Sequence, residues 1–192
     1  MPPKGKATHA RLIDEAIAQV TVRGLAAVSL QDVAGAAGVS KSAVLKHFQS
    51  KEALQTQVVD IMIERFVAAV WAPAEPLEPG RARLDRIFRG ELDWIDGLDR
   101  PGGCPLQATA IELDDQPGPL RETLKASQLR WARVLKREFR TLFPEADDGA
   151  LELKVFQFKG LVLAYGHSRR LLDDETARGQ ALAAYQGLVA AA

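Results

Sequence analysis

Apolar residues recur at intervals of three and four through most of the chain, which is the spacing of helices with one buried face. The first stripe consists of Leu12, Ile13, Ala16, Ile17 and Val20. Gly24 follows it, at the place where a helix typically ends. Later stripes cover residues 54–70, 84–98, 120–142, 151–165 and 182–189. No segment shows the alternating pattern of a half-buried strand, so the chain is predicted to be all-α, with about nine helices.

Two short helices are predicted between the first stripe and the second. Ser29 opens one of them, with Asp32 three residues later in an approximate capping box. Ser40 caps the other, at 41–47, and Gly38 lets the backbone turn between the two helices without a Cβ penalty. This arrangement is the helix-turn-helix pattern, whose second helix enters the major groove of DNA. The alternative, a two-helix turn in an ordinary bundle with a solvated outer face, stays open on the pattern alone.

The polar and small residues of this pattern are the candidate DNA contacts. Lys41 and Lys46 can reach phosphates or guanine, and Ser42 can hydrogen-bond with either. The methyl group of Ala43 can contact thymine. The candidates also include residues at two helix N-termini and further along the second helix, so that the whole set is Ser29, Lys41, Ser42, Ala43, Leu45, Lys46, His47 and Lys51.

Charge is balanced over the 192 residues, with 25 Lys and Arg against 25 Asp and Glu. The first 50 residues carry six basic and three acidic side chains. The positive field therefore lies at the N-terminal end of the chain, where a polyanionic partner is expected.

Several classes of protein do not fit the sequence. Cys104 is the single cysteine, which excludes an internal disulfide, and no Cys or His spacing suits a metal. There is neither a signal peptide nor an apolar run long enough to span a membrane. The three histidines fall in different elements and no nucleophile–base set or phosphate-binding glycine loop occurs, so an enzyme is not expected. These features favour a cytoplasmic protein without a metal or cofactor.

The segment LIDEAIAQVTVRGLAAVSLQDVAGAAGVSKSAVLKHFQSKEALQTQVVD resembles the DNA-binding domain of the tetracycline-repressor (TetR/AcrR-type) family of bacterial transcription regulators. The matching features are Gly24 after the first helix, VAGAAGVS across the turn, HF at 47–48 and SKEAL at 50–54. The resemblance covers about a quarter of the chain. The later helices match the family by architecture rather than by motif.

The resemblance implies a homodimer that places two recognition helices about one DNA turn apart on a palindromic operator. It also implies a C-terminal domain whose small-molecule ligand releases the DNA. We expect a helix-turn-helix domain with a basic N-terminal arm at residues 1–50 and an effector-binding and dimerisation domain at 51–192, connected by helix 51–71. The expected function is that of a ligand-responsive repressor. The alternative is a DNA-binding regulator without a small-molecule effector, which responds to a protein partner or to redox chemistry at Cys104.

Two residues depart from the family pattern. Ser42 lies near a position that is commonly Gly, and Leu45 stands where the family nearly always has an aromatic residue, usually Tyr. The hydroxyl group of that tyrosine usually contacts a phosphate, and leucine cannot replace it. The loss of one neutral hydrogen bond is worth about 1 kcal/mol, roughly a fivefold change in affinity.

The later helices supply candidates for the effector site, although core packing is the simpler explanation for each apolar residue among them. No charged residue stands out as a counter-ion, so a largely apolar or neutral effector is expected. Cys104 precedes a predicted helix N-terminus, a location that lowers a thiol pKa. The candidate effector-binding residues are Trp94, Cys104, Gln107, Ile111, Trp131 and Phe158.

The last two helices are expected to form the dimer interface. The first of them carries apolar residues, such as Phe156 and Leu163, outside its main stripe, and small residues that allow close helix approach. The final helix, ALAAYQGLVAAA, is also small and apolar. An internal helix pair of the bundle is the alternative, but two-fold pairing is the commonest oligomer and matches a palindromic site.

Overall fold

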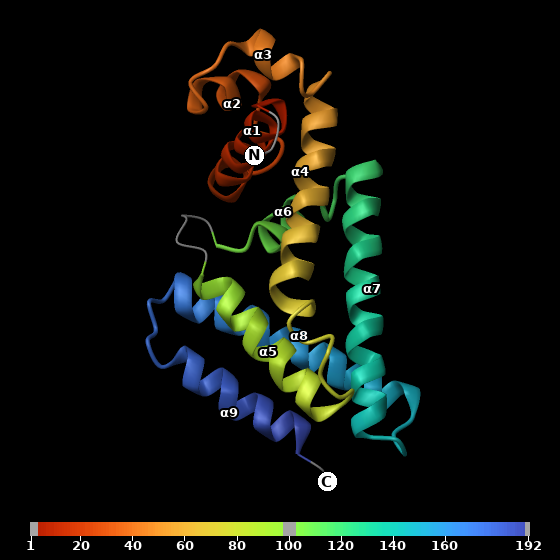
Figure 1. Cartoon of the computed structure of the whole chain (residues 1–192). Helices are drawn as coiled ribbons and strands as arrows, with labels where there is room; N and C mark the ends of the chain where they lie inside the picture. The colour runs from red at the N-terminus through yellow and green to blue at the C-terminus, as the bar shows by residue number, and fades with distance from the viewer. Residues whose placement is uncertain (1–3, 98–102, 191–192) are drawn as a thin grey trace. The chain divides into compact units, whose positions relative to one another are not determined.

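The computed structural model describes residues 4–97 and 103–190. Within these ranges the chain consists of helices and connecting loops and has no strand, which confirms the all-α prediction (Figure 1). The elements are α1 (Lys4–Arg23), α2 (Leu30–Ala36), α3 (Lys41–Leu45), α4 (Lys51–Phe66), the π-helical segment η1 (Val67–Trp71), α5 (Arg81–Asp96), α6 (Pro105–Leu113), α7 (Pro119–Leu142), α8 (Asp148–Arg170) and α9 (Ala177–Val189).

The chain divides into two compact units, and two of the divisions between them fall inside helices, in α4 and in α7. The first unit lies within residues 1–65 and 99–125, and the second within residues 66–98 and 126–192. The first unit therefore combines the N-terminal helices with α6. The division expected between residues 50 and 51 separates the proposed DNA-binding function from effector binding and dimerisation, and it stays a prediction.

Local signals place the helix ends of the first unit as predicted. Gly24 follows α1 with a φ of 83°, in the left-handed region that glycine adopts without strain. The hydroxyl group of Ser29 accepts a hydrogen bond from the Asp32 N–H, and the Asp32 carboxylate accepts one from the Ser29 N–H, which completes the capping box. Ser40 caps α3 in the same way by accepting from the Ala43 N–H.

Two details of the first unit differ from the expectation. The segment expected as a basic arm is helical from Lys4 onward, because its Lys, Ala and Arg residues favour helix and no proline interrupts them after position 3. The first three residues lie outside the described ranges. Helix α3 ends at Leu45, two residues before the predicted end, and a turn leads from there to the buried ring of Phe48.

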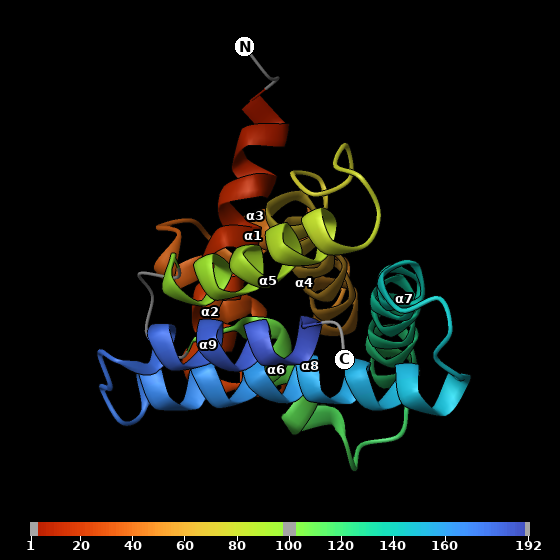
Figure 2. The same ribbon diagram turned by 90° about the horizontal axis from the view of Figure 1, so that it is seen from below.

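The second unit is built on a long antiparallel pair formed by α8 and α9, with α5 packed against α8 (Figure 2). Its centre is a group of aromatic rings. Phe88 stacks on Tyr185 with 4.2 Å between ring centroids, and Phe158 meets both rings edge-on. The apolar residues of α8 that face this core repeat at helical spacing, as predicted: Leu151, Val155, Phe158, Val162 and Tyr165.

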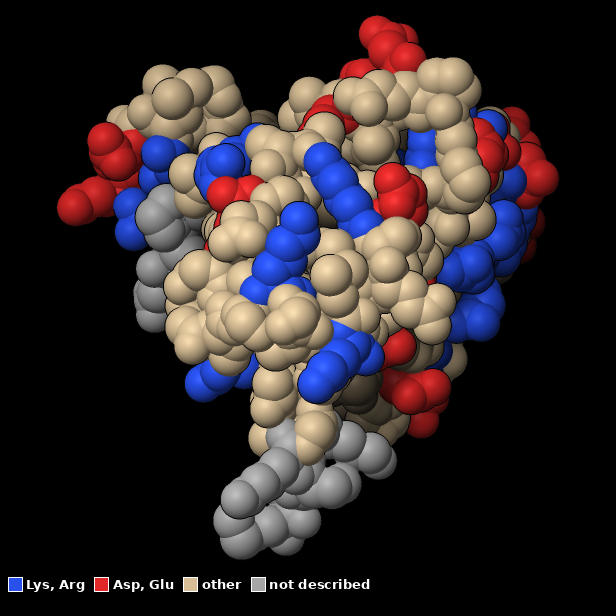
Figure 3. Space-filling view, turned by 90° about the horizontal axis from the view of Figure 1, so that it is seen from above, with Lys and Arg blue, Asp and Glu red and all other residues tan. Residues whose placement is uncertain are grey.

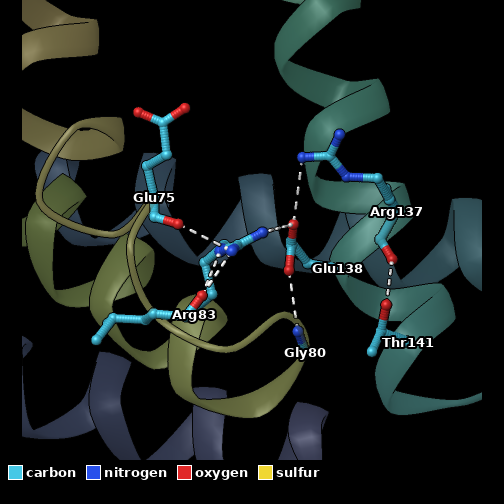
Figure 4. A network of polar contacts seen from close by, with 7 residues as sticks. Glu75, Gly80, Arg83, Arg137, Glu138 and Thr141 are labelled. Carbon is cyan, nitrogen blue, oxygen red and sulfur yellow. Dashed lines mark hydrogen bonds and ion pairs between the residues drawn. The ribbon is translucent and has the colours of Figure 1, made fainter.

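A buried ion pair fixes the proline-rich loop between η1 and α5 (Figure 4). The Glu138 carboxylate is fully buried, and it accepts hydrogen bonds from Arg83 at 3.1 Å and from the Gly80 N–H at 2.9 Å. The other nitrogens of Arg83 donate to the carbonyl groups of Glu75 and Leu77. A charge in the interior is tolerated when it is paired and hydrogen-bonded in this way.

Candidate nucleic-acid interface

The turn between α2 and α3 has the geometry of a helix terminus closed by glycine. Gly38 adopts a φ of 63°. Its N–H donates to the Gly35 carbonyl, and the Val39 N–H donates to the Ala34 carbonyl at 3.0 Å. This pair of bonds is the Schellman motif, which ends α2 and redirects the chain into α3. The angle between the two short helices therefore follows from local backbone bonding.

One side of α3 is anchored in the first unit. Val44 is fully buried, and so is Phe48 in the turn that follows. Val33 of α2 and the apolar stripe of α1 complete this core. Because these apolar residues hold one side of α3 inside, its other side is presented outward.

The outward side of α3 carries most of the predicted DNA contacts. Lys41, Ser42 and Lys46 are exposed, and Ala43 is half-buried. Leu45 lies among them with 41% of its surface exposed. Figure 3 shows the face seen from above, where Lys and Arg side chains in blue and Asp and Glu side chains in red are separated by uncharged surface. The arrangement offers individual cations for phosphates and a mixed polar and apolar surface for base edges.

The remaining three DNA-contact candidates have partners inside the protein, as Ser42 also has in the hydroxyl group of Ser40. Ser29 uses its hydroxyl group in the capping box with Asp32. The ammonium group of Lys51 donates to the Ala26 carbonyl at 2.5 Å. His47 is half-buried, with its ring centroid 5.8 Å from that of His9 on α1. The roles of these residues in DNA contact stay predictions.

A carboxylate from α6 holds the turn between α1 and α2. Glu112 accepts hydrogen bonds from the N–H groups of Leu25, at 2.5 Å, and Ala26, at 2.6 Å. From α4, Gln55 donates to the Leu25 carbonyl at 2.9 Å. Sequence reasoning missed this contact. The glutamate looks like any polar residue of a helix, and no sequence pattern ties it to a turn 87 positions away.

The candidate effector residues are divided between the two units. Cys104, Gln107 and Ile111 belong to α6 and its N-terminal cap in the first unit, where Cys104 is buried and Ile111 is 73% exposed. Trp94 and Trp131 belong to the second unit and are half-buried. Phe158, in the same unit, is fully buried in the aromatic core described above. The contact of these six residues with a ligand stays a prediction.

Four aromatic residues of the second unit form what we call the tryptophan cluster: Phe66, Trp71, Trp94 and Trp131. Adjacent rings meet almost at right angles, with centroids separated by 5.9 Å for Phe66 and Trp94, 5.3 Å for Phe66 and Trp131, and 6.4 Å for Trp71 and Trp131. Such edge-to-face contacts are favoured between aromatic side chains.

Glu91 of α5 joins this cluster. Its Oε1 accepts a hydrogen bond from the indole N–H of Trp131 at 3.0 Å. Burial raises the pKa of the Glu91 carboxyl to about 7, against the opposite effects of this hydrogen bond and of the Lys159 charge. The sequence contains a signal for its position, because Glu91 lies three residues before Trp94 and four after Ile87, on the apolar side of the helix.

In residues 4–97 and 103–190, no three His, Cys, Asp or Glu side chains are grouped so that they could hold a metal ion. No helix in the same ranges is both long and apolar enough to cross a membrane.

Comparison with known proteins identifies both parts of the chain. Residues 12–58 match the family described as bacterial regulatory proteins, tetR family. Residues 80–185, more than half of the chain, match the tetracyclin repressor-like C-terminal domain.

Individual relatives agree with these matches. A TetR transcriptional regulator from Chloroflexus aurantiacus has a similar structure, with 26% identity, a TM-score of 0.75, and coverage of 97% of this chain and 94% of that one. The transcriptional repressor DhaR of a Mycobacterium species is 28% identical over 109 residues, which are 56% of this chain and 51% of the relative. The Escherichia coli repressor ComR is 27% identical over 126 residues, 65% of this chain and 60% of the relative. The matched segments thus span between half and three fifths of the curated relatives.

A further structure is similar in fold. AibR, solved in complex with isovaleryl coenzyme A and operator DNA, is 19% identical and has a TM-score of 0.72, with coverage of 91% of this chain and 96% of that one. Since the helix-turn-helix geometry, the all-helical second unit and both family matches agree, the chain belongs to the tetracycline-repressor family of bacterial regulatory proteins.

Proposed function

We propose that this protein is a transcriptional repressor that binds a palindromic operator as a homodimer and releases it when a small molecule binds the C-terminal domain. The main support for the proposal is the exposed side of α3. A glycine-closed turn and a buried inner side direct its Lys41, Ser42 and Lys46 outward together. This is the arrangement that a recognition helix needs in a major groove. The protein acts in this proposal by binding, in the cytoplasm, rather than as an enzyme.

The α3 surface supports a division of labour among its residues. Lys41 and Lys46 supply charge for phosphates or for guanine, and Ala43, near the start of α3, is placed for a thymine methyl group. Leu45 adds an exposed apolar side chain to this surface, so it makes an apolar contact with a base or sugar instead of a hydrogen bond to a phosphate.

Dimerisation is supported by the outward side of α8. Leu153, Phe156, Gly160 and Leu163 are all exposed, and they follow each other at intervals of three and four, opposite the buried stripe. Phe156 has 75% of its surface exposed. A continuous apolar stripe of this kind on a helix is typical of an interface, and glycine allows two helices to approach closely. On α9, the exposed Ala183, Ala184 and Gly187 extend the small, apolar surface.

Repression and the binding of a small molecule are supported by the relatives. DhaR and ComR are named as repressors, and the AibR structure contains both a coenzyme A thioester and operator DNA. For the present protein we propose a ligand of its own in the second unit, where the partly exposed tryptophan cluster offers aromatic surface to a small molecule.

Fluorescence anisotropy with DNA tests the proposal. Labelled fragments from around the protein's own gene, and a scrambled sequence of equal length, are titrated with protein over a range of KCl concentrations. We expect a salt-sensitive preference for one fragment and a stoichiometry of two chains per site. Lys46→Ala should weaken binding to every sequence and make the salt slope shallower by about one. Equal affinity for all fragments at every salt concentration, or a monomer on DNA, would exclude the operator proposal.

A further inference from the structure

We infer that the tryptophan cluster and Glu91 together form a binding site for an organic cation, a molecule that carries an ammonium or similar positive group beside apolar surface. This inference names the chemical class of the effector, and in that respect it rests on the proposed function. It also replaces the neutral, apolar effector that the sequence led us to expect.

The first support is the arrangement of the rings. Interplanar angles of 85° to 90° separate the contacting rings of the cluster. In each contact the edge of one ring lies on the face of the next, and the ring faces of the cluster point in different directions. All four aromatic residues are only partly buried, so ring surface remains open to a molecule from solvent.

The second support is that cations already lie against this cluster. The guanidinium carbons of Arg83 and Arg137 lie 5.6 Å and 5.9 Å from the centroid of Trp71, within the range of cation–π attraction. Positive charge therefore lies next to the indole of Trp71, from two arginines that Glu138 also holds.

The third support is the contrast between two glutamates of the same unit. Glu138 is buried and has two arginine partners, Arg83 at 3.1 Å and Arg137 at 3.4 Å. Glu91 is half-buried; among the described residues its hydrogen-bond donor is the neutral indole of Trp131, and no lysine or arginine there lies within ion-pair distance. Lys159 acts on this carboxylate only from beyond ion-pair distance, so the paired charge that would offset its partial burial is missing.

A cationic ligand supplies that missing charge. Its positive group would lie against the ring faces and beside the Glu91 carboxylate, and its apolar part would cover the remaining aromatic surface. A neutral apolar ligand would gain nothing from Glu91, and an anionic ligand would be repelled by it. Of the three charge classes, the site therefore favours the cation.

Intrinsic fluorescence offers a direct test, because the chain has three tryptophans and all of them, Trp71, Trp94 and Trp131, belong to the cluster. The probe is benzyltrimethylammonium at pH 8, compared with neopentylbenzene, its uncharged carbon isostere. We expect saturable quenching by the cation, with an affinity at least about tenfold above that of the isostere.

Variants separate the carboxylate from the rings. Glu91→Gln keeps an oxygen that can accept from Trp131 but removes the charge, so it should lower the affinity for the cation about tenfold and leave the isostere unaffected. Glu78→Gln, at an exposed position of the same unit, is the matched control and should bind as the wild type does. If Glu91→Gln does not fold by circular dichroism, wild-type binding is compared at pH 5.5 and pH 8. The cation should then bind more weakly at the lower pH, where Glu91 is protonated.

Equal affinities for the cation and its isostere, or an unchanged cation affinity in Glu91→Gln, would overturn the inference. Anisotropy with operator DNA in the same samples distinguishes this failure from that of the proposed function. Specific DNA binding without cation binding leaves the regulator intact and rejects the ligand class. Cation binding that leaves DNA affinity unchanged supports the ligand class and rejects the proposed effector response.

Discussion

The carboxylate of Glu112 accepts a hydrogen bond from the backbone N–H of Leu25 at 2.5 Å, which joins α6 to the turn that separates α1 from α2. The Ala26 N–H donates to the same carboxylate at 2.6 Å. These bonds make the position of the helix-turn-helix segment dependent on α6. We expect Glu112→Ala to lower the free energy of unfolding by about 1–3 kcal/mol, because two amide donors lose a charged acceptor.

Urea denaturation followed by circular dichroism measures this loss, and anisotropy measures DNA affinity in the same samples. Glu112→Gln should lose less stability than Glu112→Ala, because its amide oxygen still accepts one hydrogen bond. Glu64→Gln, at an exposed position on α4, is the control. If both Glu112 variants are as stable as the control, the bonds to the turn contribute nothing to the fold.

Gly24 should be the least replaceable glycine of the first unit. Its φ of 83° is unfavourable for other residues, and a Cβ atom there would lie 3.0 Å from the Glu112 carboxylate. We expect Gly24→Ala to cost about 1–2 kcal/mol of stability. Gly35→Ala, in α2 with open space around a Cβ, should be neutral or stabilising by up to about 1 kcal/mol. Thermal unfolding of the two variants side by side checks the prediction, and equal melting temperatures would refute it.

Leu45 is a position where a single substitution should strengthen DNA binding. It is exposed on α3, so a tyrosine fits there without disturbing the core. A tyrosine hydroxyl group that hydrogen-bonds to a phosphate is worth about 1 kcal/mol, so Leu45→Tyr should raise operator affinity roughly fivefold. Leu45→Phe has the ring without the hydroxyl group and is the control. A gain that is equal in both variants would assign the effect to the ring and not to the hydrogen bond.

Phe156 should be needed for assembly and dispensable for the fold of one chain. It lies with 75% of its surface exposed on α8. Phe156→Glu places a charge in the proposed interface, and we expect it to weaken dimerisation by at least about 2 kcal/mol, the value of a buried phenyl side chain. Sedimentation velocity over a concentration series measures the dimer, and helicity is compared by circular dichroism. Glu152→Gln, next to the stripe but outside it, is the control. A Phe156→Glu protein that remains dimeric would place the interface elsewhere.

Glu91 should make stability fall as the pH rises towards neutrality. In the unfolded chain its carboxyl group ionises near the ordinary pKa of 4.5, whereas burial raises the folded-state pKa to about 7. Between these values the folded protein keeps a proton that the unfolded chain has lost, so each rise in pH favours unfolding. The contribution is complete above pH 7 and amounts to roughly 3 kcal/mol. Glu91→Gln should remove it. Urea denaturation of both proteins at pH 5 and pH 8 checks this, and a wild-type minus variant difference that does not change with pH would contradict it.

The amino-acid sequence by itself determined the helices of this protein and the candidate DNA contacts on α3. The caps at Ser29 and Ser40, the glycine turn at Gly38 and the apolar stripes depend on bonds and contacts between residues a few positions apart, so they could be read in order along the chain. The end of α3 was predicted two residues late, because the turn before Phe48 is set by packing of that ring and not by a local stop signal.

Only the tertiary structure decided which distant polar groups meet. The bond from Leu25 to Glu112 joins residues 87 positions apart, and that from Trp131 to Glu91 joins residues 40 positions apart. In the sequence each of these glutamates is one acidic residue among 25 Asp and Glu on mostly helical segments. Their environments, one a pair of backbone amides and the other a group of indole rings, arise when the apolar faces of the helices pack. Packing then determines whether a carboxylate remains in water or is partly buried beside a particular hydrogen-bond donor. This is the physical difference between a solvated surface residue and a candidate functional group.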